Sequence, residues 1–597
     1  MKITYRVSKE GMGKKQSLEG IRKSDMPTPE QVENRKVARL KRFDPTRVVL
    51  TSILVFLIEI LVLYLFNVPV VRWSIDYLRH QDGSLSAISY KTIKVKLADE
   101  LPTTLRNELQ VKLSDISFND TKRFEFVTEN PDISVLYTAK AAEGDTVIAN
   151  LFLVPVGHAY WVRDAINKGN VQQDEILVPK GMKSLYEKII EGYAAKVPKT
   201  KEATDMVASL KAQEKSVGFV DFFELSNKYK LLSLNGKYFF DNAPEGGIPY
   251  FLVLTGTSAK GKSIVKARAN AVFPESFSKD SLMSLRMTGV TAITRGLGIK
   301  TNASGDPGYA ARKIGDFLSK ADLTHTSNEI SMVKGCVPTG GVSFCMVPSH
   351  IAALKNSGVD IIELTGNHNN DKGNSNNTSS IKTYTALGWS YFGGGLNAAD
   401  AAKILYKEVK GTKIAFLGYN YYDTVYKTGA IAKKTTAGAN SWSPEKIVKD
   451  VAEARKNKAD VIIVDFQYQE CWSYTDNGTT VQQCYGANAV TNQKKVFRQA
   501  IDAGADIVVG TQAHQPQTYE IYKNKMIYYG LGNLYFDQTE QLGTRQGLIL
   551  THYMYKGKYL GTALTTTIFD SDLLTYVTTG SKRTSLLKSL QEWRPKN

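Results

Sequence analysis

The sequence is poor in cysteine and histidine. Its 597 residues include four cysteines, all beyond position 330, and seven histidines. No cysteines have the CxxC spacing of a zinc ribbon, and no internal repeat is present. These absences argue against a cysteine-built zinc module and a repeat architecture. The length exceeds what one hydrophobic core supports, so two or three domains are expected.

The chain also lacks an arginine-rich helix and basic segments interleaved with aromatics, which mark many nucleic-acid-binding proteins. The net charge is +18, but residues 1–47 supply seven of those charges, thirteen Lys and Arg minus six acids. The rest is scattered along the chain. We therefore expect no nucleic-acid partner. An anionic partner such as lipid headgroups or a cell-surface polymer fits this charge better.

A long apolar run occupies residues 48–71. From Val48 to Phe66 only a few polar side chains interrupt it, and as a helix this stretch spans roughly 28 Å, about the thickness of a bilayer core. No small-residue cleavage site follows, so the run predicts a signal-anchor rather than a cleaved signal peptide. The basic tail, residues 1–47, would stay in the cytoplasm and the rest of the chain would lie outside. A buried helix of a soluble protein is the alternative. Glu59 is either protonated or contacts a membrane partner protein.

A first outer domain is predicted at residues 88–273. Strand-like runs alternate there with helical stretches such as 185–194 and 203–213, which indicates an α/β fold. The segment 217–234 resembles the closing part of a periplasmic solute-binding domain, although it carries no ligand motif. An unrelated α/β spacer domain is the alternative.

A second outer domain is predicted at residues 285–583. Apolar strand candidates are dispersed along it, with helical segments between the earlier ones, which predicts a layered α/β sandwich. The strand candidates are 287–293, 359–364, 413–417, 461–466, 506–509, 526–529, 548–555 and 560–568.

Polar residues of the kind that bind metals or carry protons follow several of these strand candidates. Gly366-Asn367-His368 ends one of them, and the segments 321–329, 465–471, 510–517 and 529–538 end others. Loops at the carboxyl ends of parallel strands converge on one crevice. We therefore expect these segments to meet, with His368 and His514 on neighbouring strand ends. The alternative is that each histidine is an ordinary satisfied polar residue.

Taken in this order, the segments resemble the CapA family, known from capsule and poly-γ-glutamate synthesis and similar to calcineurin-like metallophosphoesterases. The resemblance covers nearly the whole second domain. It implies that Asn367 is a metal ligand, that His368 is a proton donor facing a phosphate and that His514 is a metal-ligating imidazole. It places Asn328 in the same pocket as a ligand, with Glu329 as a ligand or general base.

The resemblance also implies residues that line or shape the pocket. Glu470 would line its mouth, Gln512 would belong to the pocket, Asn533 would shape the loop beneath it, and Asp537 would help hold that loop. In such folds paired divalent metals bind an anionic oxygen and generate hydroxide.

Three positions depart from the family pattern. Val290 stands where the family has a metal-binding Asp, residues 466–468 replace a His-Trp-Gly, and Gln512 replaces the first residue of a His-x-His. Asn and His alone supply too little negative charge for two divalent ions. We therefore expect one divalent metal (Mn, Fe or Zn) or a metal-free pocket, with His325 as a substitute donor.

The cysteines form two close pairs, Cys336 with Cys345 and Cys471 with Cys484. An outward-facing domain lies in an oxidising compartment, so two local disulfides are predicted. A zinc site is the alternative.

The sequence as a whole predicts a single-pass cell-membrane protein with its amino terminus in the cytoplasm and its other domains outside. We expect it to act in the synthesis, export or remodelling of an anionic capsule polymer, with metal-assisted hydrolysis or transfer at an ester or amide if it is an enzyme. A non-catalytic scaffold that binds polymer or a partner is one alternative. A receptor-like role, in which residues 88–273 bind a small solute, is another.

Overall fold

The structure is a computed structural model, and it describes residues 91–101, 103–116, 122–167, 175–193, 199–213, 216–255, 276–468 and 493–592. Within these, the described parts of 94–109 and 126–597 belong to one compact unit. The predicted cytoplasmic tail and the apolar run, residues 1–47 and 48–71, lie outside the described residues. Among the residues that are described, no helix is long and apolar enough to cross a bilayer.

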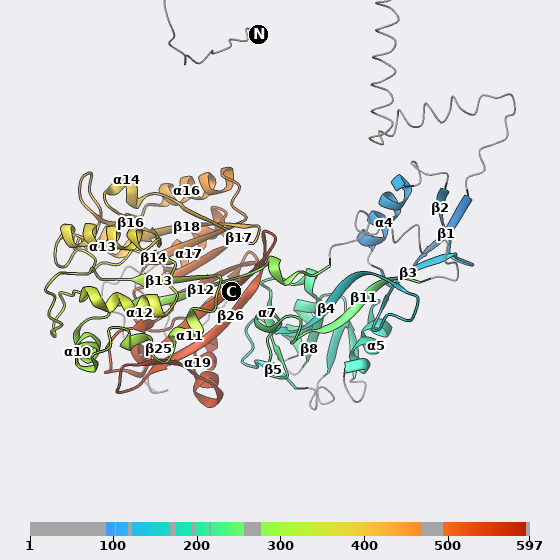
Figure 1. Cartoon of the computed structure of the whole chain (residues 1–597), viewed down its shortest axis with the longest axis horizontal. Coiled ribbons are helices and arrows are strands. Elements are labelled where there is room, and N and C mark those ends of the chain that lie inside the picture. The colour runs from blue at the N-terminus through green and yellow to red at the C-terminus, as the bar shows by residue number, and fades with distance from the viewer. Residues whose placement is uncertain are drawn as a thin grey trace, which may run out of the picture. The chain divides into compact units, whose positions relative to one another are not determined.

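The first domain is built on one mixed sheet with the order β1-β3-β11-β4-β8-β6-β7, and β9 lies beside β4. The strands are β1 Lys91–Leu97, β3 Ile133–Thr138, β4 Thr146–His158, β6 Ile176–Pro179, β7 Thr200–Ala203, β8 Val217–Asp221, β9 Tyr229–Leu231 and β11 Ile248–Thr255. Helix α5 (Lys183–Tyr193) buries one apolar face against this sheet, and α6 (Met206–Ala212) begins at Asp205, whose carboxylate caps it. The predicted α/β class is confirmed (Figure 1).

The second domain contains two larger sheets. Its strands are β12 Leu282–Thr291, β13 Leu323–Asn328, β14 Ile361–Glu363, β15 Ser390–Phe392, β17 Leu405–Val409, β18 Thr412–Asn420, β20 Val461–Gln467, β21 Ile507–Thr511, β22 Tyr519–Tyr522, β23 Lys525–Tyr528, β24 Asn533–Tyr535, β25 Gln546–Tyr555, β26 Lys558–Phe569 and β27 Thr575–Val577. One sheet has the order β15-β14-β13-β12-β25-β26-β27, with β24 beside β12. The other has the order β17-β18-β20-β21-β23-β22. Strands β12 to β15 run parallel, as do β18, β20, β21 and β23.

The two sheets pack face to face, with helices on their outer faces. On strand β20, Val461 and Ile463 enter the core between the sheets, whereas Ile462 and Val464 face α16 (Pro444–Lys456) and α17 (Gln493–Asp502). Burial on both faces accounts for the continuous apolar run of this strand. The other sheet is covered by α10 (Arg295–Ser304), α11 (Gly315–Leu318), α12 (Ile351–Asn356) and α13 (Asn374–Ala386). In Figure 1, α11 and α12 lie on one side of β12, β13 and β18, and α16 lies on the other. The predicted layered sandwich is therefore present.

The end of the second domain differs from the prediction. The domain was expected to end at residue 583, but helix α19 (Gly580–Glu592) continues to residue 592. Leu586, Leu587 and Leu590 are buried in the core between the sheets, which accounts for the longer helix. Among the remaining elements, α16 was not anticipated, and most predicted strands lie within two or three residues of those observed.

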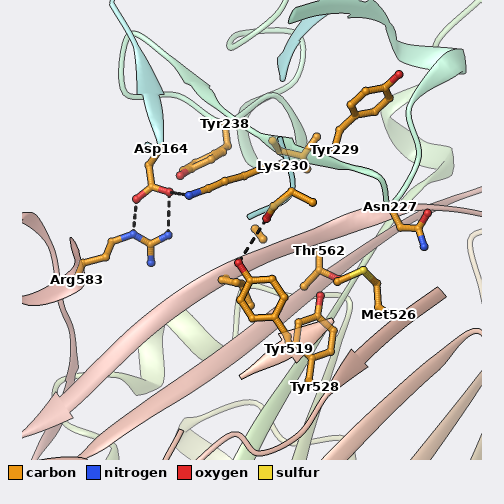
Figure 2. Close-up of a pocket in the computed structure, with 14 residues that line it drawn as sticks. Asp164, Asn227, Tyr229, Lys230, Tyr238, Tyr519, Met526, Tyr528, Thr562 and Arg583 are labelled. Carbon is orange, nitrogen blue, oxygen red and sulfur yellow. Dashed lines mark hydrogen bonds and ion pairs between the residues drawn. The ribbon is translucent and has the colours of Figure 1, made fainter. Parts of the chain in front are cut away.

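The first and second domains contact each other through a cluster of charged side chains. Asp164 accepts hydrogen bonds from Arg583 of α19, one of them 3.0 Å long, and lies 2.6 Å from the ammonium of Lys230. Figure 2 shows these side chains beside a small pocket lined also by Tyr519 and Tyr528. Burial lowers the pKa of Lys230 to about 8, against the opposing effect of Asp164. The ion cluster therefore joins the two domains at a partly buried contact.

Candidate functional site

The parallel strands of both sheets end at one edge of the sandwich. Two contacts between the sheets show this directly. The side-chain amide of Asn420, at the end of β18, donates to Thr365 O after β14 at 2.6 Å, and the amides of Gln467 and Asn367 meet at 2.6 Å. Either orientation of the Gln467 carboxamide keeps the second contact. Convergence of the polar strand ends, which the sequence predicted, is thus found.

Glu329 lies at the centre of this edge. Its side chain is 2% exposed, and neither carboxylate oxygen has a hydrogen-bond partner among the described residues. His514 Nε2 is 3.9 Å from Glu329 Oε2. The Gly366-Asn367-His368 loop passes directly against the glutamate, because a Cβ on Gly366 would lie 2.7 Å from Glu329 Cα. Three of the predicted site residues, Glu329, His368 and His514, therefore meet at one place.

His368 is held by a carboxylate and by an aromatic ring. Its Nδ1 is 2.8 Å from Asp371 Oδ2, and its ring centroid is 4.3 Å from that of Phe344. Burial lowers the pKa of His368, but the hydrogen bond with Asp371 and the charges of Glu329 and Asp371 outweigh this and raise the pKa above its ordinary value. The imidazole is therefore positioned and biased toward its cationic form.

His514 is oriented by Asn533. The Asn533 amide nitrogen donates to His514 O at 3.0 Å and to Thr544 O at 2.9 Å, which leaves its oxygen to face His514 Nδ1 at 2.9 Å. Because that oxygen only accepts, Nδ1 carries the proton and Nε2 faces Glu329 with its lone pair. His514 and Gln512 both have positive φ values, 56° and 85°. Left-handed backbone at non-glycine residues is strained and often marks a functional loop.

Neutral amides gather at the strand ends, where the family resemblance places the metal ligands. Gln467 and Gln512 bond to each other, and Gln467 also meets Asn367 and Asn420. Val290 is buried within β12, and its backbone N–H donates to Gly532 O at 2.9 Å. A valine and mutually bonded amides offer no charge to a divalent ion. The residues at the strand ends therefore do not fit a two-metal centre.

Several other predicted residues have packing roles. The Asn328 amide nitrogen donates to Ile330 O at 2.7 Å and to the Tyr384 hydroxyl at 2.9 Å, whereas its Oδ1 has no hydrogen-bond partner among the described residues, so its role as a ligand stays a prediction. Asp537 accepts from Arg295 and from the backbone N–H of Gly296 at 2.7 Å, so it holds the start of α10 as well as its own loop. Glu470 lies outside the described residues.

His325 is not placed beside Glu329 but in a cluster that the sequence did not reveal. Its Nε2 is 3.2 Å from Asp465 Oδ2, and ligand atoms of His325, Glu363 and Asp465 all lie within 4.8 Å of one another. All three side chains are fully buried. The signal that was overlooked is an ionisable residue inside each of three otherwise apolar or uncharged strands. A group that could hold a metal ion is thus present, one layer inside the strand ends.

Burial perturbs each member of this cluster, which we call the inner trio. It raises the pKa of Glu363 to about 8, with the charge of Asp465 as the second cause. It raises the pKa of Asp465 well above its ordinary value and lowers that of His325 to about 4. Each shift favours the neutral form, because burial outweighs the attraction between His325 and Glu363.

One of the two predicted disulfides lies within the described residues and is formed. Cys336 and Cys345 are bonded, with their Cα atoms 6.0 Å apart. The bond closes the loop that carries Phe344 onto the ring of His368. Cys471 and Cys484 lie outside the described residues.

The first domain has a cavity of about 350 Å³. Its lining includes three tyrosines, Tyr137, Tyr186 and Tyr250, with Asp221 and Glu224. Tyr250 donates to Asp221 Oδ2 at 2.5 Å, and burial raises the pKa of Asp221 to about 6. Tyrosine faces next to carboxylates are typical of sites for organic cations.

Comparison with known proteins identifies the second domain. Residues 284–538 match the family model described as bacterial capsule synthesis protein PGA_cap. A capsule biosynthesis protein CapA of Bacillus anthracis is 28% identical over 279 residues, which are 45% of this chain and 64% of that protein. A PGA biosynthesis protein CapA of Bacillus subtilis (strain 168) is 30% identical over 207 residues, which are 34% of this chain and 50% of that protein. The second domain belongs to the CapA family.

The chain thus spans between half and two thirds of the length of these relatives, both of which are named for capsule or PGA biosynthesis. The family model is likewise described by capsule synthesis. An ABC-type phosphate transport receptor from Vibrio cholerae is similar over 30% of this chain and 94% of its own, at 8% identity and a TM-score of 0.25. A likeness of that size says nothing about the ligand of the first domain.

Proposed function

We propose that the chain is a membrane-anchored component of capsule synthesis whose CapA domain acts on an anionic surface polymer outside the cell. The names of the relatives support action on a capsule polymer. The apolar run at 48–71, which follows a basic tail, supports membrane anchoring. The Cys336–Cys345 disulfide suits an oxidising compartment. Scattered positive charge suits a polyanion as well as lipid headgroups.

The proposed reaction is hydrolysis or transfer at an amide or ester of the polymer, and the observation that carries it is the convergence of Glu329, His368 and His514. Glu329 has unpartnered oxygens and takes the proton from the attacking water or amine. His368, held by Asp371, gives its proton to the leaving nitrogen or oxygen. His514 Nε2 faces Glu329 and accepts a hydrogen bond from the attacking group. The two-metal chemistry of the family resemblance is not used, because the strand ends do not fit it.

The test measures the length of the polymer after incubation with the protein. The purified full chain in detergent is incubated with poly-γ-glutamate, and the products are sized by gel electrophoresis. Glu329→Gln should lower the rate by about 100-fold or more, because it removes the base without changing the shape of the side chain. Glu540→Gln makes the same chemical change at an exposed position and should leave the rate unchanged. Equal rates for Glu329→Gln and the wild type would contradict the proposal.

The amide cluster favours a second candidate, a scaffold that binds polymer without altering it. Asn367, Gln467 and Gln512 satisfy one another, as they would in a domain that uses its fold and not its strand-end chemistry. A wild-type chain that binds poly-γ-glutamate but never shortens or extends it would favour the scaffold over the enzyme.

The first-domain cavity favours a receptor-like function in addition. Its tyrosines and carboxylates fit a small organic cation such as an amine. A thermal-shift screen of the full chain with amines should give a shift that Asp221→Asn removes and Glu143→Gln, an exposed control, keeps. A screen in which no amine shifts the midpoint would count against this role.

A further inference from the structure

The inner trio joins both sheets of the CapA domain. His325 and Glu363 come from β13 and β14 of one sheet, and Asp465 comes from β20 of the other. Two residues earlier on each strand stand Leu323, Ile361 and Ile463, which belong to the core between the sheets. Because side chains two apart on a strand share a face, the trio also points into that core.

The trio has the composition and spacing of a metal site. One imidazole and two carboxylates are ligands that first-row divalent ions accept. Metal–ligand bonds of about 2.0–2.2 Å place ligand atoms roughly 3–4 Å apart. The observed spacing, 3.2 Å for His325 Nε2 to Asp465 Oδ2 and at most 4.8 Å across the trio, needs only a small contraction.

The second observation concerns the hydrogen-bonding atoms of the trio. Both ring nitrogens of His325 and all four carboxylate oxygens of Glu363 and Asp465 are buried, and none makes a hydrogen bond of normal geometry with a described residue. Two carboxylates buried side by side repel each other, and unpaired buried charge is strongly unfavourable. A divalent cation would cancel both charges and give the orphaned atoms a partner.

We propose that His325, Glu363 and Asp465 bind one divalent transition-metal ion between the two sheets of the CapA domain. The ion is structural: it ties β13 and β14 to β20 and lies one layer inside the amides at the strand ends. It takes no part in the acid–base chemistry of Glu329, so the proposal does not rest on the proposed function. The alternative arrangement is a metal-free core in which Glu363 and Asp465 stay protonated.

Metal content tests the proposal on the full chain. The protein is purified in detergent, dialysed against metal-free buffer and analysed by inductively coupled plasma mass spectrometry for Mn, Fe, Co, Ni, Cu and Zn. We expect about one ion per chain in the wild type and at least a tenfold loss in Glu363→Gln. His514→Ala, which removes the strand-end imidazole, should keep the full amount. No metal in the wild type, or loss in His514→Ala with retention in Glu363→Gln, would overturn the proposal.

A second measurement covers the case in which Glu363→Gln fails to fold. Wild-type chain is unfolded in guanidinium with EDTA, then refolded in detergent with EDTA or with Zn²⁺ or Mn²⁺ added. The chain refolded with metal should unfold at a higher temperature than the chain refolded with EDTA, and the same comparison in His325→Gln should show no difference. An equal midpoint for wild type with and without metal would mean that the core is satisfied by protons instead.

Discussion

The strand ends of the CapA domain and the inner trio lie on the same strands but differ in charge. On β20, Gln467 faces the strand-end amides, whereas Asp465, two residues earlier, is buried with His325 and Glu363. The outer position, at the strand end, carries a neutral amide with partners. The inner position, within an apolar core, carries a carboxylate whose oxygens make no hydrogen bond with a described residue. A shared fold therefore does not by itself show where a cation binds. The positions of the charged residues along each strand decide where it binds.

The largest expected effect comes from breaking the inner trio. Asp465→Ala leaves Glu363 and His325 buried without their partner and should lower the free energy of unfolding by about 3–5 kcal/mol. Gln467→Ala, on the same strand and face, removes neutral hydrogen bonds and should lower it by about 1–2 kcal/mol. Guanidinium denaturation measures both. A smaller loss of unfolding free energy for Asp465→Ala than for Gln467→Ala would contradict the expected difference between the two regions.

Removal of the disulfide tests the contribution of the strand-end site and leaves the residues of the inner trio unchanged. Replacing Cys336 and Cys345 by serine opens a loop with a sequence separation of 9 and should lower the free energy of unfolding by about 2–3 kcal/mol. The contact between Phe344 and His368 should loosen, so the action on polymer should fall as well. The metal content should stay the same. Loss of metal in this variant would show that the two regions are coupled.

Asn533→Ala should have an intermediate effect. It removes the amide that orients His514 and leaves the carbonyls of His514 and Thr544 without that donor, for a loss of about 2 kcal/mol in unfolding free energy. Rates on polymer should fall through kcat, since His514 would no longer face Glu329 in one tautomer. A normal kcat with the expected loss of stability would remove His514 from the proposed chemistry.

Asp221 in the first domain provides a buried carboxylate that does have partners, Tyr250 and the backbone N–H of Phe223. Burial raises its pKa to about 6, so the folded state holds its proton more tightly than the unfolded state. Its contribution to stability is therefore greatest below pH 4 and falls as the pH rises to 6, by about 1–2 kcal/mol after allowance for its partial exposure. Denaturation curves of wild type and Asp221→Asn at several pH values should differ in this window. Parallel curves from pH 4 to 6 would contradict the assignment.

The sequence predicted most of the fold because its signals were local. Apolar runs such as Val461–Phe466 and Leu548–Tyr555 match β20 and β25 closely, and the loop motif at Gly366-Asn367-His368 placed the site at the strand ends. The same reasoning predicted that Glu329, His368 and His514 would meet.

The inner trio could not be predicted in the same way. Strand β13 is buried along its whole length, so alternation of polar and apolar residues does not reveal which face each side chain takes. His325 was assigned to the strand-end site because it lies close to Glu329 in the sequence. The pairing of β13 with β14 and the packing against β20 instead direct its side chain toward the core between the sheets. Helix α19 beyond residue 583 was likewise missed, because its few leucines become a signal only once the core between the sheets is known.

The most direct test of the account is a crystal structure of the protein with anomalous diffraction recorded at the absorption edges of zinc, manganese and iron. The account predicts one anomalous peak among His325, Glu363 and Asp465 and none among Asn367, Gln467 and His514. A peak beside His514 and Asn367, with the inner trio empty and its carboxyls hydrogen-bonded to each other, would contradict it.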